Sequence, residues 1–231
     1  MAFSCSAVVP WGRSFDEYLR MFALTDKELE LRLLGCADGP ASFNAEMSRR
    51  GHRAVSCDPL YSLASWQIEG RIAATYDYMM CQVRENQAQF NWSFIKSPEE
   101  LGILRMSAMK TFLEDYETGR RTGRYVIGEL PNLPFKPDSF DLALCSHFLF
   151  VYSVQLSFGF HLEAIKAMCQ VAREARIFPL LTYNADPSPL VEPLQQLLIR
   201  AGYEVSIETV PYEFARGGNE MMRVLRENVR R

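Results

Sequence analysis

The sequence predicts one α/β domain with a Rossmann-like, doubly wound and mostly parallel sheet. Three observations predict this fold: short apolar runs alternate with helical patterns, a small-residue turn follows the first run, and an acid ends the second. Runs of this length, bounded by turn residues, are too short for typical helices and are expected to be buried strands. Strands that alternate with helices form a parallel sheet covered on both faces.

Five apolar runs are expected to be strands, and the first four of them to be central strands: 31–36, 54–57, 125–127, 140–145 and 175–181. Helical patterns occupy 42–50, 157–172 and 189–201. After Gly202, two further segments, 203–210 and 221–225, flank the turn Gly217-Gly218-Asn219. This pair is expected to finish the sheet in antiparallel fashion.

We expect residues 1–231 to form a single domain. Two stretches of it are additional to the alternating strands and helices. Residues 11–24 have apolar side chains at helical spacing after Ser14, a suitable N-cap, and predict a lid helix ahead of the sheet. Residues 61–124 lie where one crossover helix would suffice. We expect a cap of two or three helices there, broken near Asn91 and Ser97-Pro98.

The composition narrows the class of function. The chain of 231 residues carries a formal charge of −3, which argues against a nucleic-acid partner because such binding neutralises phosphates. No apolar run approaches the length of a membrane span, and residues 1–10 lack a signal-peptide pattern. Six dispersed cysteines, including Cys5, suggest reduced thiols and no metal site. We expect a cytoplasmic protein with a small-molecule substrate; the oligomeric state stays open.

The first expected strand runs into a turn of small residues and then a helix. Such residues let backbone approach a ligand, and the helix N-terminus offers free N–H groups. Many strand-to-helix turns look similar, so this pattern alone is weak. The candidate ligand-binding residues of the turn are Gly35, Ala37, Asp38 and Gly39.

The second expected strand ends in Asp58-Pro59, 19 residues after Gly39. This is the spacing at which a carboxylate meets a ribose diol in Rossmann-type sites. Alone, Asp58 would also fit a solvated strand end; with the turn, it indicates a nucleotide site. A nicotinamide site is disfavoured because Ser42 stands at the third glycine of the G-x-G-x-x-G pattern.

The stretch 128–144, GELPNLPFKPDSFDLAL, carries a family resemblance. It resembles the class I S-adenosylmethionine-dependent methyltransferases, whose third and fourth strands are joined by G-D-A-x-x-L-P-F-x-x-x-S-F-D. The resemblance implies S-adenosylmethionine as cofactor, with Glu129 near the adenine and Leu130 against its ring. It also implies that Asp38 and Gly39 line the methionine and ribose part of the pocket, with Asp58 on the ribose hydroxyls.

The turn departs from the family pattern. Ala37 and Ala41 stand where the family has glycine, and Gly35 stands where it usually has an acid. Alanine fits such a turn if its φ is negative.

Four further residues are candidates for chemistry, and Ser146 and Arg13 for cofactor binding. Ser146-His147 follows the fourth strand, where His147 is expected to be a general base, a donor to the substrate or a packed histidine. Tyr183 and Asn184 follow the fifth strand, or form a surface turn. Arg13 is expected to pair with the methionine carboxylate. Tyr18 either faces the sulfonium or packs in the core.

Three hypotheses about function follow. The first is methyl transfer from S-adenosylmethionine to a small molecule. In the second, the chain resembles the azetidine-2-carboxylate synthases, which cyclise S-adenosylmethionine itself and release methylthioadenosine. The third, suggested by the altered turn, is a non-catalytic S-adenosylmethionine-binding protein.

Overall fold

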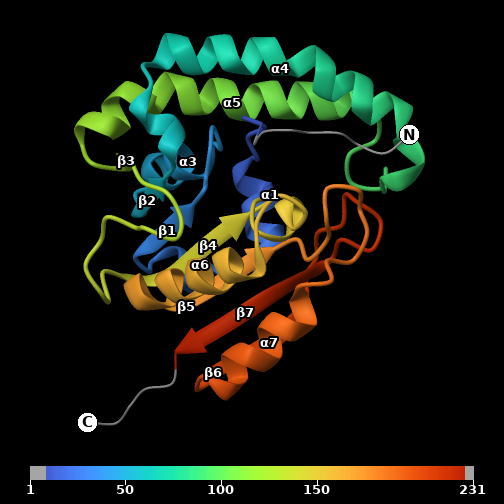
Figure 1. Ribbon diagram of the computed structural model, residues 1–231. Helices are drawn as coiled ribbons and strands as arrows, with labels where there is room; N and C mark the ends of the chain where they lie inside the picture. The colour runs from blue at the N-terminus through green and yellow to red at the C-terminus, as the bar shows by residue number, and fades with distance from the viewer. Residues whose placement is uncertain (1–8, 227–231) are drawn as a thin grey trace.

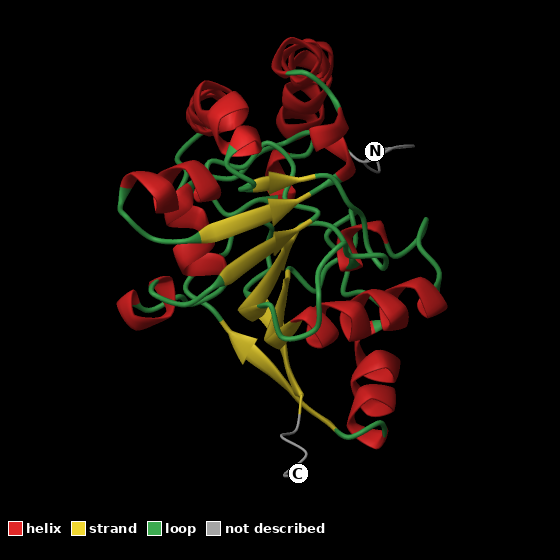
Figure 2. Ribbon diagram, turned by 90° about the vertical axis from the view of Figure 1, so that its left-hand side faces the viewer, coloured by secondary structure: helices red, strands yellow, loops and turns green. Residues whose placement is uncertain are grey.

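The computed structural model describes residues 9–226, so Cys5 lies outside the described residues. Within them, seven strands form one mixed sheet in the order β3-β2-β1-β4-β5-β7-β6, with helices on both sides (Figures 1 and 2). The strands are β1 Leu33–Cys36, β2 Ala54–Cys57, β3 Tyr125–Val126, β4 Phe140–Ser146, β5 Ala172–Phe178, β6 Tyr203–Thr209 and β7 Glu220–Arg226. The predicted Rossmann-like α/β fold is confirmed.

The direction of the strands also matches the prediction. β1 pairs in parallel with both β2 and β4, and β5 continues the parallel part beside β4. β7 lies between β5 and β6 and is antiparallel to both. The expected antiparallel ending is therefore confirmed.

Two strand predictions were wrong in detail. The run 125–127 is not central: β3 holds two residues at the sheet edge, and Ile127 is 53% exposed. β5 begins at Ala172, three residues earlier than expected, and ends at Phe178. The start of β5 was not predicted because it contains charged residues, which interrupt the apolar run. In the structure Glu174 forms ion pairs with Arg176 and with Arg223 of β7.

Alternate residues of the central strands face two separate layers of helices. Leu33 and Leu142 pack with the N-terminal helices, whereas Leu34 and Ala143 pack with the later ones. The first layer holds α1 Phe15–Met21, α2 Asp26–Leu29 and α3 Phe43–Arg49, and the second holds α6 Phe158–Val171 and α7 Val191–Arg200. This double burial explains why the strands read as continuous apolar runs.

The expected lid helix is shorter than predicted and belongs to the core. Ser14 caps α1 as predicted, in a capping box with Glu17. Tyr18 and Met21 on this helix are buried, and α1 packs on α3. The short helix α2 was not predicted, although Thr25 and Glu28 form a second capping box that the sequence displays.

The segment 61–124 forms the expected helical cap. η1 Pro59–Ser62 leads to α4 Ser65–Glu85 and η2 Gln87–Gln89; α5 Pro98–Arg121 starts after its N-cap Ser97. The predicted breaks are confirmed. α4 and α5 lie side by side across the top of Figure 1, and α5 also packs on α3 and β3. Of the helices in residues 9–226, none is long and apolar enough to cross a membrane.

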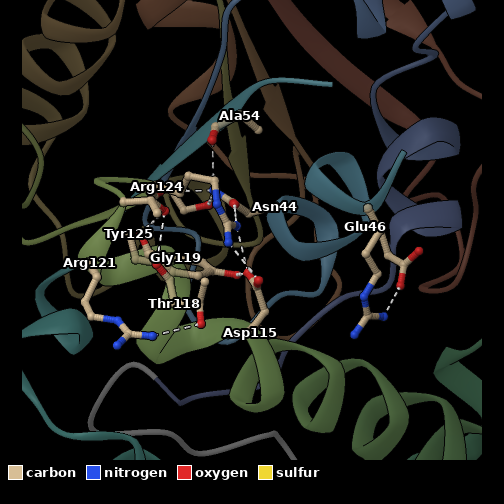
Figure 3. A network of polar contacts seen from close by, with 12 residues as sticks. Asn44, Glu46, Ala54, Asp115, Thr118, Gly119, Arg121, Arg124 and Tyr125 are labelled. Carbon is tan, nitrogen blue, oxygen red and sulfur yellow. Dashed lines mark hydrogen bonds and ion pairs between the residues drawn. The ribbon is translucent and has the colours of Figure 1, made fainter. Parts of the chain in front are cut away.

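A polar network ties the cap to the sheet edge (Figure 3). The guanidinium of Arg124, just before β3, forms an ion pair with Asp115 of α5 at 2.7 Å and donates to Asn44 Oδ1 of α3 at 2.7 Å. Asn44 Nδ2 in turn donates to the carbonyl of Ala54 in β2 at 3.1 Å. The network fixes α5 and α3 relative to the strands whose ends form the site described next.

Candidate functional site

A cavity of about 750 Å³ lies at the carboxyl ends of β1, β2 and β4, beneath the cap. The strand order reverses between β1 and β4, and open α/β sheets bind ligands at this point. All but two of the predicted site residues line the cavity: Arg13, Tyr18, Ala37, Asp38, Gly39, Asp58, Pro59, Glu129, Leu130, Ser146, His147 and Tyr183.

The other two residues are corrections. Gly35 lies in β1 beside Asp38, and a Cβ at Gly35 would stand 2.4 Å from the Asp38 carboxyl. The absence of a Cβ at Gly35 leaves room for that carboxyl, and Gly35 is not among the residues that line the cavity. Asn184 is exposed on the turn after β5 and is absent from the cavity lining. Its surface-turn interpretation is the one that holds.

In the turn after β1, an alanine and a glycine both adopt the left-handed backbone conformation that glycine favours. Ala37 has a φ of +51° and Gly39 a φ of +54°. The condition of a negative φ is therefore not met at Ala37, where alanine adopts the left-handed conformation at some cost in strain. The amide of Ala37 donates to the carbonyl of Cys57 at 2.9 Å, which holds the turn against the end of β2.

Asp58 organises the same turn from β2. Its Oδ2 accepts the amide of Gly39 at 2.9 Å, and its Oδ1 accepts the amide of Leu60 at 2.7 Å. Burial raises the pKa of Asp58 to about 6, even though both hydrogen bonds act in the opposite direction. Each carboxylate oxygen retains a second lone pair, so Asp58 can still accept hydrogen bonds from a ligand.

Asp38 is held by two hydroxyl groups at the base of the cavity. Tyr18 and Ser56 each donate to its carboxyl at 2.5 Å. Burial raises the pKa of Asp38, and burial and the charge of Asp38 raise that of Tyr18 well above its usual value. Tyr18 also stacks on Phe43 at 4.6 Å between centroids, so it is both a core residue and part of the wall.

His147 stands at the end of β4 in another left-handed conformation, with a φ of +52°. Its Nδ1 lies 2.9 Å from Ser146 Oγ, and its amide donates to the carbonyl of Phe178 at 2.6 Å. Burial, together with the positive charges of Arg13 and Arg105, lowers the pKa of His147 well below its usual value. The imidazole is therefore neutral at pH 7.

Arg13 brings a positive charge to the cavity from the segment before α1. Its Nη1 donates to the carbonyl of Trp11 at 2.5 Å, and its Nε is buried without a hydrogen-bond partner. Among residues 9–226 no carboxylate forms an ion pair with it. Burial and the nearby Arg105 lower the pKa of Arg13 to about 10, where it stays protonated at pH 7. An anionic ligand group is the natural partner of such a guanidinium.

Three buried residues beside Arg13 were not predicted from the sequence. Glu17 of α1 and Arg105 of α5 form a fully buried bidentate ion pair, with N···O distances of 2.6 and 2.7 Å. Tyr212 donates to Glu17 Oε1 at 2.6 Å. The motif Ser-x-x-Glu at Ser14 marks Glu17 as a capping residue, but no local pattern points to its partners in distant segments.

The cavity thus has two unlike walls. The strand wall consists of Ala37, Asp38, Gly39, Asp58, Ser146 and His147, and is polar. The cap wall is largely apolar, and its polar side chains are Arg71, Thr75 and Arg105. It consists of Arg71, Ala74, Thr75, Met79 and Val83 of α4 with Leu101 and Arg105 of α5. The two sides meet where the Tyr183 hydroxyl donates to Met79 Sδ at 3.9 Å. Glu129 and Pro59 are exposed at the rim, and Leu130 is buried.

The strand order and the helical layers define a Rossmann-like α/β fold. The chain is similar to magnesium protoporphyrin IX methyltransferase ChlM from Synechocystis PCC 6803, solved with bound SAM: 10% identity, 92% of this chain, 78% of that chain, TM-score 0.48. It is also similar to a putative S-adenosyl-L-methionine-dependent methyltransferase from Methanococcus maripaludis: 10% identity, 94% and 84% coverage, TM-score 0.46.

A nearer relative shows the family. The chain is 35% identical over 216 residues to the uncharacterized protein MJ0045 of Methanocaldococcus jannaschii, and the match covers 93% of this chain and 95% of that protein. The chain belongs to the family of this archaeal protein. No protein-family model matches the sequence.

Proposed function

We propose that the protein is an S-adenosylmethionine-dependent methyltransferase that acts on a small molecule. One observation carries the proposal: residues from the ends of β1, β2 and β4, far apart in the sequence, converge on one cavity at the point where the strand order reverses. Ligands of open α/β sheets bind at this point. Bound S-adenosylmethionine supplies an electrophilic methyl group.

The donor set of the cavity fits this group. Asp58 has lone pairs for the ribose hydroxyls beside the open backbone at Gly39, where a Cβ would meet no atom within 4 Å. Leu130 offers an apolar surface to the adenine, with Glu129 at the rim. Arg13, whose Nε lacks a partner, would take the methionine carboxylate. The Asp38 carboxyl would lie near the positively charged methionine part of the ligand and stabilise it electrostatically.

The rest of the cavity points to an acceptor that is largely apolar. Met79, Val83 and Leu101 of the cap wall face this space, and further apolar side chains line it: Phe90, Phe148, Val151, Tyr152, Leu156, Phe160, Leu181 and Phe214. Mostly apolar walls with a few polar groups are typical of small-molecule sites. The apolar walls also exclude water from the reacting atoms, and a desolvated nucleophile is more reactive.

His147 is the candidate general base. A neutral imidazole at the end of β4 is in the form that takes a proton from a hydroxyl, thiol or ammonium group of the acceptor, although its lowered pKa makes it a weaker base than free histidine. Ser146 Oγ, 2.9 Å from Nδ1, would hold the ring in place. Positioning and desolvation suffice for acceptors that are already good nucleophiles, so His147 matters most for weakly acidic ones.

The first test separates the three hypotheses. Purified protein is incubated with S-adenosylmethionine, alone and with a panel of apolar phenols, thiols and amines, and S-adenosylhomocysteine and methylthioadenosine are quantified by mass spectrometry. We expect S-adenosylhomocysteine that depends on both enzyme and acceptor. Enzyme-dependent methylthioadenosine without acceptor would replace methyl transfer by cyclisation, and tight binding without either product would favour the non-catalytic binder.

A pair of variants ties the activity to the cavity. Asp38→Asn should weaken binding of S-adenosylhomocysteine, measured by calorimetry, because it removes the negative charge beside the ligand. Asn184→Ala is the matched control, since Asn184 lies outside the cavity, and it should retain wild-type affinity. Failure of the wild-type protein to bind S-adenosylmethionine or S-adenosylhomocysteine would refute the proposal.

A further inference from the structure

Glu17 has its hydrogen-bonding capacity filled. Oε1 accepts from Arg105 Nη2 at 2.7 Å and from Tyr212 Oη at 2.6 Å. Oε2 accepts from Arg105 Nη1 at 2.6 Å and from the amide and hydroxyl of Ser14 at 2.8 and 3.0 Å. With about four lone-pair sites on a carboxylate, five donors leave no place for a sixth.

Arg13 is the cation that this arrangement leaves out. Arg13 and Glu17 are near enough for each to affect the pKa of the other, yet they form no ion pair. Burial raises the pKa of Glu17, but the charge and hydrogen bonds of Arg105 outweigh this effect and bring the pKa down to about 2. The three side chains therefore hold two positive charges and one negative charge, and the unpaired positive charge lies on the cavity-lining Arg13.

We propose that Arg105 is a positioning residue: by occupying both oxygens of Glu17, it keeps the Arg13 guanidinium free to bind a ligand carboxylate. The inference rests on the proposed function, in that the carboxylate belongs to the methionine part of S-adenosylmethionine. An arginine suits this task because its planar fork covers both oxygens of one carboxylate, which the single ammonium group of lysine does not.

Two probes that differ in the carboxylate test the inference. S-Adenosylhomocysteine carries the amino-acid group, and methylthioadenosine shares the nucleoside but lacks it. Calorimetry measures the Kd of both for the wild type, Arg105→Lys, Arg105→Met and Arg13→Met. Arg13→Met and Arg105→Met should each weaken S-adenosylhomocysteine about ten-fold or more, the scale of one lost charge-assisted contact. Methylthioadenosine should keep its Kd within about two-fold.

The double variant Arg13→Met/Arg105→Met shows through which group Arg105 acts. In the Arg13→Met background, loss of Arg105 should leave the Kd of S-adenosylhomocysteine unchanged, because no guanidinium remains for Glu17 to capture. Additive losses, or equal losses for both probes, would give Arg105 a merely structural role and overturn the inference. Lys110→Met, on an exposed position of the same helix, is the control and should behave as wild type.

Milder variants keep the test decisive if Arg105→Met does not fold. Arg105→Lys leaves one oxygen of Glu17 without a contact from residue 105, and Tyr212→Phe leaves Oε1 with Arg105 Nη2 as its one donor while preserving the ring. Both should selectively weaken S-adenosylhomocysteine, by less than Arg13→Met does. Wild-type Kd values in both variants would refute the inference while leaving the proposed function intact. Absence of S-adenosylhomocysteine binding to the wild type would refute the proposed function itself.

Discussion

The two walls of the cavity are built in opposite ways. The strand wall comes from short turns directly after β1, β2 and β4, and its polar groups bind one another: Asp58 to Gly39, Ser146 to His147. The cap wall comes from two long helices and is largely apolar, with Arg71, Thr75 and Arg105 as its polar side chains; the charge of Arg105 is matched by Glu17 on α1. The strand wall is thus fixed by hydrogen bonds between the ends of neighbouring strands, and the cap wall by an ion pair between helices α1 and α5.

The difference suggests that the two walls bind different parts of the ligands, a division of labour between cofactor and acceptor binding. A polar wall set by strand ends suits the part of the ligand that carries ribose hydroxyls and charges, because hydrogen bonds need fixed partners. An apolar wall on separate helices suits a variable acceptor, because apolar contacts constrain its shape more than its orientation. Variants on the two walls should therefore differ in kind as well as in size.

The largest effect is expected where the cap wall depends on α1. Glu17→Ala leaves Arg105 as an unpaired charge in the core and should cost about 3–5 kcal/mol of the free energy of unfolding. Urea denaturation measures this loss in the free energy of unfolding. Asp16→Ala, on the exposed side of the same helical turn, should cost no more than about 0.5 kcal/mol. Similar costs for the two variants would mean that the buried ion pair does not hold the cap wall.

Asp58 gives the next largest effect, on binding rather than stability. Asp58→Ala removes a charged acceptor of ribose hydrogen bonds and should weaken S-adenosylhomocysteine by roughly 1.5–3 kcal/mol. Val83→Ala on the cap wall should change the same Kd by less than about two-fold, since it faces the acceptor space. Calorimetry on both variants tests the division of labour, and equal losses would contradict it.

His147 makes stability depend on pH. Its pKa in the folded chain lies well below the usual 6.5, so the unfolded chain binds more protons in the window between the two values. Stability is therefore full above about pH 6.5 and falls as the pH drops, by at most about 1.4 kcal/mol per pH unit. His147→Asn, which tolerates the left-handed backbone, should flatten the dependence in urea titrations at about pH 7.5 and 5.5. An unchanged slope would show that His147 is not held neutral.

The smallest effects have opposite signs within one turn. Ala37→Gly should stabilise the protein by about 0.5–1 kcal/mol because it relieves a left-handed alanine. Ala41→Gly, where φ is not positive, should destabilise it by a similar amount because glycine gains unfolded-state entropy. Thermal unfolding of both variants checks this. Destabilisation by Ala37→Gly would mean that the methyl group contributes packing that outweighs the strain.

The sequence predicted the strand wall well because its residues follow directly from strand ends. Asp38, Asp58 and His147 could be placed on one edge of the sheet once the strands were recognised. The φ of Ala37 could not be predicted, since the surrounding turn imposes it. Asn184 was misplaced because β5 ends at Phe178, and the residues beyond it leave the sheet.

The cap wall was predicted only as a set of helices. The pairing of Glu17 with Arg105 joins residues 88 positions apart, and no periodic pattern encodes such a contact. The central position expected for β3 failed for a similar reason. An apolar run shows that a strand is buried, yet β3 is covered by α5 at the sheet edge rather than by a neighbouring strand.

The place of β7 has a consequence for how the chain is made. β7, residues 220–226, comes last among the described strands but lies inside the sheet, between β5 and β6. During synthesis β6 therefore emerges before the strand it must pair with, and the free edge of β5 stays open until residue 226 has been added. The nascent chain has to avoid intermolecular strand pairing during that interval, and its sheet closes only after the last strand has been translated.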